Sequence, residues 1–398
     1  MGSYEPESSP RQKSSDGRWE QFPCDQCGAS LHYSPGAQAL SCGYCGNVNA
    51  IPQIDLRVEE QPLKETLARL DEVLESRTEL TVSCEECGAE YTLPEDIHSA
   101  KCDFCGTPVV AETTEHRQLS PQGVLPFSIT QASADQAFSD WLGRLWLAPS
   151  KLKKHARGES HLKGLYTPYW TYDSDSHAAY KGMRGTYYQV SQRVQVVVNG
   201  RTQWRTQMVT KVRWSPVSGQ VKRWFDDVLV IGSHSLPTHI VNRLRSWRLD
   251  ALEPYQGAWL SGFSSELYQR GPEESFVEAA QIMDEGLRRQ IVNDIGGDQQ
   301  RITHMRSWHQ NVHFKHILLP LWVAAYRFRG KSYRFVVNGQ TGEVQGERPY
   351  STWKIAGLVL LGLVAVGGLF WMAENGYFDT VLNARNQGFS TGGYNVRY

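Results

Sequence analysis

The eight cysteines of this 398-residue chain form two copies of one pattern. In each copy, fourteen residues separate two Cys-x2-Cys pairs, and a glycine follows the second cysteine of every pair. Glycine adopts without steric cost the tight turn that directs backbone N–H groups at a cysteine sulfur. Disulfides are disfavoured because closely spaced pairs are a poor framework for so long a chain. The spacing predicts two small zinc ribbons, with the ligands Cys24, Cys27, Cys42 and Cys45 in the first and Cys84, Cys87, Cys102 and Cys105 in the second.

We expect both Zn2+ ions to be structural. Four thiolates fill a tetrahedral site, whereas a catalytic zinc keeps one position open for water or substrate. A ribbon of about 25 residues has almost no core, so metal binding supplies its folding energy. The cysteine pattern therefore predicts how these modules are held together and implies no catalytic residue.

Charge decides between nucleic acid and protein as the partner of the ribbons. Asp25 is the only charged residue between Cys24 and Cys45, and the second ribbon carries six acidic residues against Lys101. Phosphate contacts supply most of the affinity of nucleic-acid-binding proteins, so such a surface should be basic. The net charge of the whole chain is −1. We therefore expect a protein partner and disfavour nucleic acid.

A second strong signal lies near the C-terminus. Residues 355–372 contain no charge, and Trp353 and Trp371 stand at the two ends of this segment. At 1.5 Å per residue eighteen residues span roughly 27 Å, close to the thickness of a hydrocarbon core. Interfacial tryptophans are typical of membrane helices, although a buried core helix is the alternative. We predict a transmembrane helix over 353–373 that contacts membrane lipid.

The expected orientation places the N-terminus and the main domain in the cytoplasm. The first twenty residues are polar and contain no apolar export signal. Thiolate sites suit a reducing compartment. Arg348 and Lys354 precede the span, whereas Arg385 alone follows it closely. The chain is therefore expected to be a single-pass protein of the cell inner (cytoplasmic) membrane, with residues 374–398 as a short non-cytoplasmic tail.

The expected fold is multidomain. Between the ribbons, Pro62–Arg77 predicts a helix whose leucine stripe must pack on a ribbon, a second copy or another protein. Further helices are expected over Ala132–Trp146, Ser150–Arg157 and Glu273–Ile295. The predicted domains are a disordered segment 1–20, ribbon 21–54, linker with helix 55–80, ribbon 81–112, an α+β domain 119–350 and the membrane helix.

Repeated phrases mark the aromatic-rich α+β domain. Apolar residues, a proline and an aromatic residue recur at Pro126, Pro168 and Pro320. Val-Val-Asn-Gly occurs at 197–200 and 336–339, and Asn-Gly between such flanks predicts a β-hairpin. We expect an internal duplication with sheet elements over 164–232 and 301–346.

Three patterns in the sequence resemble catalytic or ligand sites. Gly330-Lys331-Ser332 lacks the first glycine of a phosphate-binding loop and is better explained as a hairpin. Asp173-x-Asp175 near His177 is better explained as a polar turn than as a carboxylate pair. The third pattern is a histidine cluster, of which His309, His313 and His316 would share a metal-binding face only if the segment were helical. The segment runs into the predicted strand before Pro320 and has no nearby acid, which disfavours a metal site but leaves it open: His304, His309, His313 and His316. We predict that the chain is not an enzyme.

Over roughly residues 20–375 the chain resembles the bacterial TFIIB-type zinc-ribbon membrane proteins. The resemblance rests on the two ribbons, on LYTPYWTYDSDSHAAYKGMRG and HILLPLWVAAYRFRGKSYRFVVNGQTGEVQGERP, and on the final apolar helix. It implies rubredoxin/TFIIB-like ribbons with the eight cysteines as zinc ligands. Such proteins are often labelled primosomal helicase relatives, but this chain has no Walker A motif. The family occurs with phage-shock-type genes, which implies a cytoplasmic partner that is SPFH/flotillin-like or PspA-like (ESCRT-III-related).

Two hypotheses follow. In the first, the chain is a non-enzymatic membrane-anchored adaptor or scaffold that recruits such a partner. In the second, it is a membrane-tethered zinc-ribbon protein associated with nucleic acid in replication or transcription, which requires salt-sensitive binding. The partner's identity, homo-oligomerisation, equivalence of the ribbons and small-ligand binding by the central domain are left open by the sequence.

Overall fold

The structure is a computed structural model, and it divides into two compact units, Met1–Phe138 with Ser160–Glu347 and Ser139–Glu159 with Arg348–Tyr398. The predicted segments 1–20, Ser150–Arg157 and most of 374–398 lie outside the described residues. The described residues are 22–52, 58–70, 74–85, 88–92, 99–102, 104, 107–110, 112–145, 162–198, 201–244, 246–328, 331–347 and 351–375.

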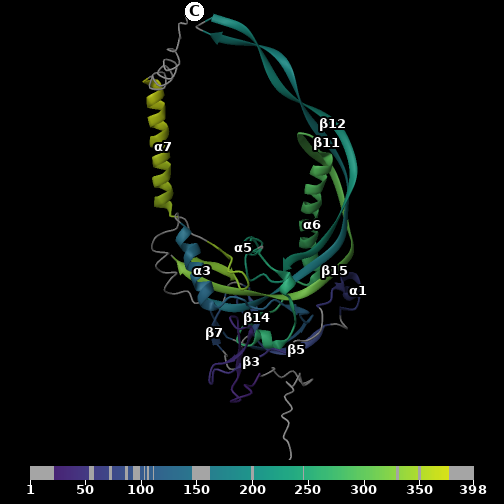
Figure 1. Cartoon of the computed structure of the whole chain (residues 1–398), viewed down its shortest axis with the longest axis vertical. Coiled ribbons are helices and arrows are strands. Elements are labelled where there is room, and N and C mark those ends of the chain that lie inside the picture. Colours follow the sequence, from purple (N-terminus) through teal and green to yellow (C-terminus); the bar gives the residue numbers. More distant parts are fainter. Residues whose placement is uncertain are drawn as a thin grey trace, which may run out of the picture. The chain divides into compact units, whose positions relative to one another are not determined.

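A twelve-stranded sheet forms the first unit, and three long strands dominate it (Figure 1). β11 (Lys163–Val198) pairs antiparallel with β12 (Arg201–Ile231) on one edge and with β15 (Gln299–Phe328) on the other. The shorter strands are β4 (Gln61–Pro62), β5 (Glu75–Ser83), β6 (Glu90–Thr92), β9 (Glu112–Gln118), β10 (Gly123–Val124), β13 (Glu253–Pro254), β14 (Ser264–Glu266), β16 (Lys331–Asn338) and β17 (Val344–Gly346).

The three proline phrases of the sequence meet in this sheet. Tyr166 of β11 lies opposite Pro320 of β15, and Val124 of β10 pairs with Leu318 of β15. Their aromatic residues pack together, since Phe127 contacts the rings of Tyr166 and Trp322 at centroid distances of 5.1 and 4.9 Å. The expected aromatic-rich core is therefore present where the phrases converge.

Two apolar layers cover the opposite faces of the sheet. Neighbouring residues of a strand point to opposite faces, and Tyr169 belongs to one layer while Trp170 belongs to the other. The Trp170 layer is completed by α6 (Pro272–Ile295), which confirms the helix predicted over Glu273–Ile295. Within that helix the buried face includes Ala279, Met283 and Leu287.

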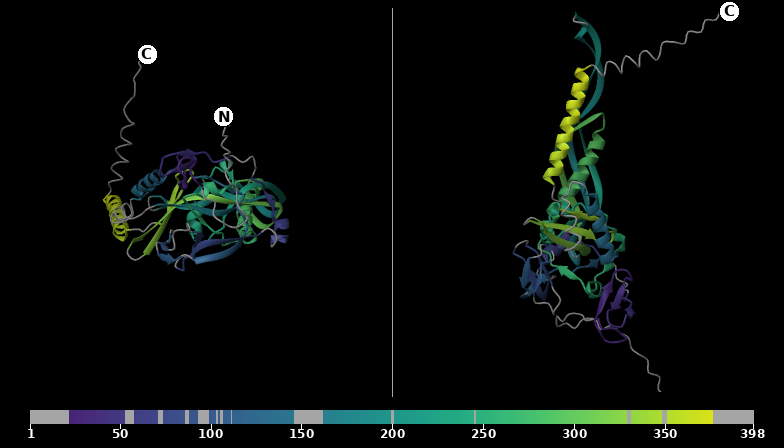
Figure 2. Two further views of the ribbon diagram at one scale, coloured as in Figure 1. Left: turned by 90° about the horizontal axis from the view of Figure 1, so that it is seen from below. Right: turned by 90° about the vertical axis from the view of Figure 1, so that its left-hand side faces the viewer.

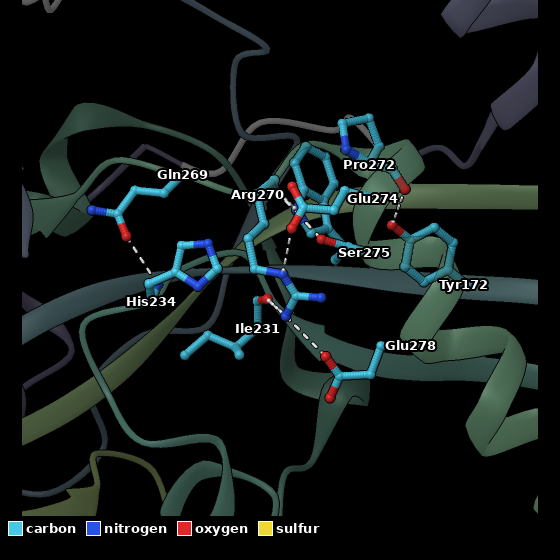
Figure 3. A network of polar contacts seen from close by, with 10 residues as sticks. Tyr172, Ile231, His234, Gln269, Arg270, Pro272, Glu274, Ser275 and Glu278 are labelled. Carbon is cyan, nitrogen blue, oxygen red and sulfur yellow. Dashed lines mark hydrogen bonds and ion pairs between the residues drawn. The ribbon is translucent and has the colours of Figure 1, made fainter. Parts of the chain in front are cut away.

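Arg270 joins the start of α6 to the base of the long strands (Figure 3). Its guanidinium lies 2.8 Å from the Glu278 carboxylate and 3.4 Å from the Ile231 carbonyl oxygen. The Tyr172 hydroxyl donates a hydrogen bond of 2.6 Å to the Pro272 carbonyl in the first turn of the helix. These contacts fix the angle at which α6 lies along β11 and β12.

The linker helix is shorter than the sequence predicts. α1 spans Leu63–Ala68, and residues 75–77, expected to be helical, begin β5 instead. β5 pairs with β9 from Glu75 opposite Gln118 to Thr81 opposite Glu112, so sheet pairing overrides the local helical preference. The leucine stripe packs in the Trp170 layer, which identifies its partner as the chain's own core: Leu63, Leu67, Leu70 and Leu74.

The turn predictions are confirmed in position. Val198 pairs with Arg201, and Phe328 pairs with Lys331, so hairpins occur at both sites. The turn after Asn338 is longer than a two-residue Asn-Gly turn. The Asn338 side chain accepts hydrogen bonds from the backbone N–H groups of Gln340 and Thr341, and Gly342 supplies the positive φ of 76°.

The remaining elements are small, apart from two helices. α3 spans Gln131–Arg144, close to the predicted Ala132–Trp146, and the Thr130 hydroxyl accepts a hydrogen bond from the Ser133 N–H at its start. α7 spans Thr352–Glu374. The short pieces are β1 (Leu31–Ser34), β2 (Ala39–Cys42), β3 (Val48–Asn49), β7 (Ser99–Lys101), β8 (Pro108–Val110), α5 (Thr238–Val241), η1 (Leu249–Ala251) and η2 (Gly257–Leu260).

The hairpin of β11 and β12 continues past the end of α6 and past its neighbouring strand (Figures 1 and 2). Pairing of β11 with β15 stops at Gly185 opposite Gln299. Beyond that point, in the part of the chain that the structure describes, β11 and β12 pair with each other alone, up to Val198 opposite Arg201. We call residues 186–213 the arm.

Candidate metal centre and membrane helix

Four cysteines come together in the small sheet of β1, β2 and β3. The sulfur atoms of Cys24 and Cys45 are 3.6 Å apart, those of Cys27 and Cys42 are 3.5 Å apart, and all four lie within 4.8 Å of one another. A tetrahedral Zn2+ with Zn–S bonds of about 2.3 Å requires sulfur atoms about 3.8 Å apart. The four thiols therefore fit one tetrahedral metal ion.

Backbone hydrogen bonds stabilise the thiolate of Cys42, one of the two buried cysteines of this set. Hydrogen bonds from the backbone N–H groups of Cys45 and Tyr44 lower the pKa of the Cys42 thiol to about 6. The turns depend on the expected glycines, since Gly28 and Gly46 have φ angles of 73° and 74°. Thiolate is the form of cysteine that binds metal. The donor set and its surroundings therefore suit a soft cation such as Zn2+.

One side of this cysteine module is fixed to the central sheet domain. The Tyr33 hydroxyl donates a 2.9 Å hydrogen bond to the Phe127 carbonyl, and the Tyr33 ring packs edge-on against Trp259. The Ser261 hydroxyl donates a 2.6 Å bond to the Leu31 carbonyl. Tyr44, between the last two cysteines, is 86% exposed. The module thus has a docked side and a side that faces solvent.

The second set of cysteines is described in part, because Cys87 and Cys105 lie outside the described residues. Cys84 and Cys102 are buried in one apolar cluster with Tyr91 and Phe104. Cys84 repeats the turn of Cys24, since its N–H donates to the carbonyl five residues later and the glycine N–H four residues later donates back.

The Gln269 side chain ties this second turn to the segment that follows β12, where it contacts His234 (Figure 3). Its amide nitrogen donates a 2.6 Å hydrogen bond to the Gly88 carbonyl, and its oxygen accepts from the His234 N–H. Strand β6 continues from this turn and pairs with β14 of the main sheet. The second cysteine set is therefore continuous with the central sheet through hydrogen bonds.

The four histidines weighed as a metal site do not come together. They lie in strand β15, not in a helix, and a strand rises about 3.3 Å per residue, so positions 304 and 316 are roughly 40 Å apart. The His309 ring bonds the Ser176 hydroxyl at 2.7 Å and lies 3.5 Å from Asp284. The His316 ring contacts the Leu119 carbonyl at 2.9 Å. A metal-binding face shared by His309, His313 and His316 would have required a helix, and these residues lie in a strand.

Asp173 lies in a buried strand, so the predicted polar turn is also wrong. The pairing register shifts beside Asp173 on both edges of β11, and His177 stacks on Trp308 farther along. Burial, followed by a hydrogen bond to Glu60, raises the pKa of the Asp173 carboxyl to about 7. One oxygen of Asp173 accepts the Asp227 N–H at 2.6 Å.

Sequence reasoning missed the group of charges around Asp173. Carboxylate oxygens of Glu60, Asp173 and Asp226 lie within 4.8 Å of one another. Lys315 compensates them, with its ammonium 2.8 Å from Asp227 and 3.2 Å from Glu60. The acids come from segments far apart in the chain. The only available signal was the single lysine in the apolar phrase that precedes Pro320.

α7 is long and apolar enough to cross a membrane, from Trp353 to Met372. No side chain in this stretch is buried, and Leu361 and Phe370 are 69% and 70% exposed. Exposure of so many contiguous apolar side chains to water is unfavourable. The helix predicted over 353–373 is present and is a candidate membrane span.

No protein-family model and no solved structure matches this chain. A curated protein of Bacillus subtilis (strain 168), described as "Uncharacterized protein YdjG", is 24% identical to it over 338 residues. The match covers 84% of this chain and 92% of that protein. The chain is therefore similar to the Bacillus protein along most of the length of both.

Proposed function

We propose that the chain is a non-enzymatic, membrane-anchored adaptor that carries two structural Zn2+ ions in zinc ribbons. α7 anchors it in the cell inner membrane, with the sheet domain in the cytoplasm. The first cysteine module recruits a cytoplasmic partner of the SPFH/flotillin-like or PspA-like class. The internal duplication of the central domain, suggested by its repeated phrases, belongs to the same proposal.

One observation carries the adaptor proposal. The first cysteine module is docked through Tyr33 and Leu31, while Tyr44 projects into solvent from the opposite turn. Exposed aromatic residues on a rigid support are frequent anchors of protein interfaces. A metal held by four thiolates stiffens this turn without an open coordination position. The geometry therefore suits presentation of a protein-binding surface.

The leucine stripe of α1 is not part of the proposed partner-binding surface. Because Leu63 and its neighbours pack in the core, they offer no surface to a partner. Partner binding is assigned instead to the solvent side of the first module, around Tyr44 and the 56% exposed Val48.

The test is affinity purification of the full-length protein from detergent-solubilised membranes, with zinc analysis and mass spectrometry of co-purified proteins. We expect about two zinc ions per chain and a partner of the named class in stoichiometric yield. Cys24→Ser should remove one zinc and the partner, Tyr44→Ala the partner alone, and the control Ser41→Ala neither. Nuclease-sensitive association with replication or transcription proteins would overturn the proposal.

A further inference from the structure

The arm and its base form a strongly basic segment. No acidic residue occurs between Asp175 and Asp226, whereas α6 beside the base carries several acids. The whole chain has a net charge of −1, so this concentration of positive charge is local. The segment contains nine cationic residues: Lys181, Arg184, Arg193, Arg201, Arg205, Lys211, Arg213, Lys222 and Arg223.

The register separates the side chains of the arm onto two faces. Tyr188 pairs with Lys211 and Val194 with Arg205, so these residues share a face that carries most of the cations. Tyr187 pairs with Val212, and the opposite face carries large apolar side chains. Three of these are well exposed, at 47%, 65% and 58%: Tyr187, Trp204 and Met208.

Among the described residues, no helix or third strand covers either face of the arm beyond its base, where Asp298 and Gln299 hydrogen-bond Tyr187. α6 ends at Ile295, where the Arg184 guanidinium bonds the Ile295 carbonyl, and β15 ends its pairing one residue later in β11. Described side chains of residues 186–195 and 202–213 are exposed or half-buried, and none is buried. A two-stranded hairpin without a covering layer is only marginally stable in water. We therefore expect the arm to be stabilised by contact with a partner.

We propose that the arm binds the anionic headgroup surface of a lipid bilayer. Tryptophan, tyrosine and methionine on one face suit the boundary between headgroups and acyl chains. When the apolar face of the arm rests on a bilayer, the cations on its other face still lie within one Debye length of the anionic headgroups. The Debye length is about 8–10 Å at physiological salt. Basic residues near an anionic leaflet each strengthen binding.

The chain also supplies a reason to choose lipid over nucleic acid, whose phosphates would satisfy the same cations. β17 ends at Gly346 and α7 begins at Thr352, so a short link joins the sheet domain to the candidate membrane helix. A bilayer that holds α7 is present at high effective concentration, whereas nucleic acid must be captured from solution. The inference rests on the anchoring part of the proposed function.

The test is hydrogen–deuterium exchange of the full-length protein in nanodiscs of phosphatidylcholine, with or without phosphatidylglycerol. We expect amide exchange in residues 186–213 to slow by about tenfold in the anionic discs. Arg205→Glu combined with Lys211→Glu should abolish this protection, since both side chains are exposed. The matched control is Arg288→Glu combined with Arg289→Glu, which makes the same change of charge on the exposed side of α6. This variant should retain the protection of the arm.

The other outcomes overturn the inference. Equal exchange of the arm in both discs would exclude recognition of anionic lipid. Protection by added duplex DNA in neutral discs, but not by phosphatidylglycerol, would assign the arm to nucleic acid. Protection that depends on protein concentration would assign it to a second copy of the chain. Exchange of α7 in the same samples reports anchoring separately, so failure of the anchor is distinguishable from failure of the arm.

Discussion

Glu266 places a carboxyl group inside the sheet domain, where it is 2% exposed. Burial raises its pKa to about 7 from 4.5, although hydrogen bonds from the hydroxyl groups of Ser233 and Ser235 oppose the increase. Between these pH values the folded state binds more protons than the unfolded state. The stabilisation of the folded state by the protonated Glu266 carboxyl is fully present below about pH 4.5. It is lost as the pH rises through 7, which lowers the free energy of unfolding by about 3 kcal/mol.

Glu266→Gln should remove this loss, because an amide keeps the acceptor oxygen and does not ionise. We expect the variant to match the natural protein near pH 5 and to exceed it near pH 8 by up to about 3 kcal/mol, or several degrees in Tm. Thermal unfolding followed by tryptophan fluorescence in detergent measures the difference. Glu285→Gln on the exposed side of α6 is the matched control and should leave the pH profile unchanged. A Glu266→Gln protein less stable at pH 8 contradicts the argument.

Lys315 is the one cation described among the acids around Asp173, and its side chain is 10% exposed. Lys315→Met would leave Asp227 and Glu60 without their partner, and breaking a buried ion pair from one side costs about 3–5 kcal/mol. We expect the free energy of unfolding to fall by an amount near the lower end of this range, since Glu60 is partly exposed. Chemical denaturation measures it against Lys222→Met, whose exposed side chain should cost less than about 0.5 kcal/mol. If the double variant Lys315→Met with Asp227→Asn is more stable than Lys315→Met alone, the loss of stability comes from the unpaired carboxylate. A double variant that is no more stable than Lys315→Met would contradict this explanation.

At the scale of an element, α6 packs against β12 through a glycine. A Cβ atom at Gly286 would lie 2.7 Å from the Phe225 ring. Alanine favours a helix over glycine by about 1 kcal/mol, but overpacking costs about 1–3 kcal/mol. We expect Gly286→Ala to destabilise the protein by about 1 kcal/mol despite its better helix propensity. Denaturation of Gly286→Ala, Phe225→Leu and the double variant should show that Gly286→Ala costs less stability when leucine replaces Phe225, because the clash with the ring is gone. Additive losses would contradict the steric explanation.

The elements that sequence predicts correctly are those with a local signal. α6 and α7 follow from apolar spacing and length, and two hairpins follow from short turns. β5 was missed because its partner β9 lies more than thirty residues away, and local periodicity cannot report such pairing. Asp173 was misplaced for a similar reason, since its buried environment is created by Glu60 and Lys315 from other segments. The four-cysteine cluster was predictable because the Cys-x2-Cys spacing is typical of residues whose four sulfur atoms bind one metal ion.

At the scale of the whole molecule, the two cysteine sets connect to the sheet domain differently. The first has its own sheet of β1, β2 and β3 and docks through side chains such as Tyr33. In the second, Cys84 directly follows β5, and β6 after it hydrogen-bonds to β14 of the main sheet. Cys84 and Cys102 also share an apolar cluster with Leu165 and Tyr169 of β11. Metal loss should therefore remain local in the first set and spread into the core from the second.

Cys24→Ser and Cys84→Ser test this difference in the full-length protein. Each should lower the zinc content by about one ion per chain. Cys84→Ser should also lower the Tm of the sheet domain by about 5 °C or more, because β6 and its cluster lose support, whereas Cys24→Ser should lower it by less than about 2 °C. Zinc analysis and thermal unfolding of the same samples provide both readouts. Equal Tm shifts would show that the two sets are equivalent, and a larger shift for Cys24→Ser would mean that the first set, not the second, supports the core.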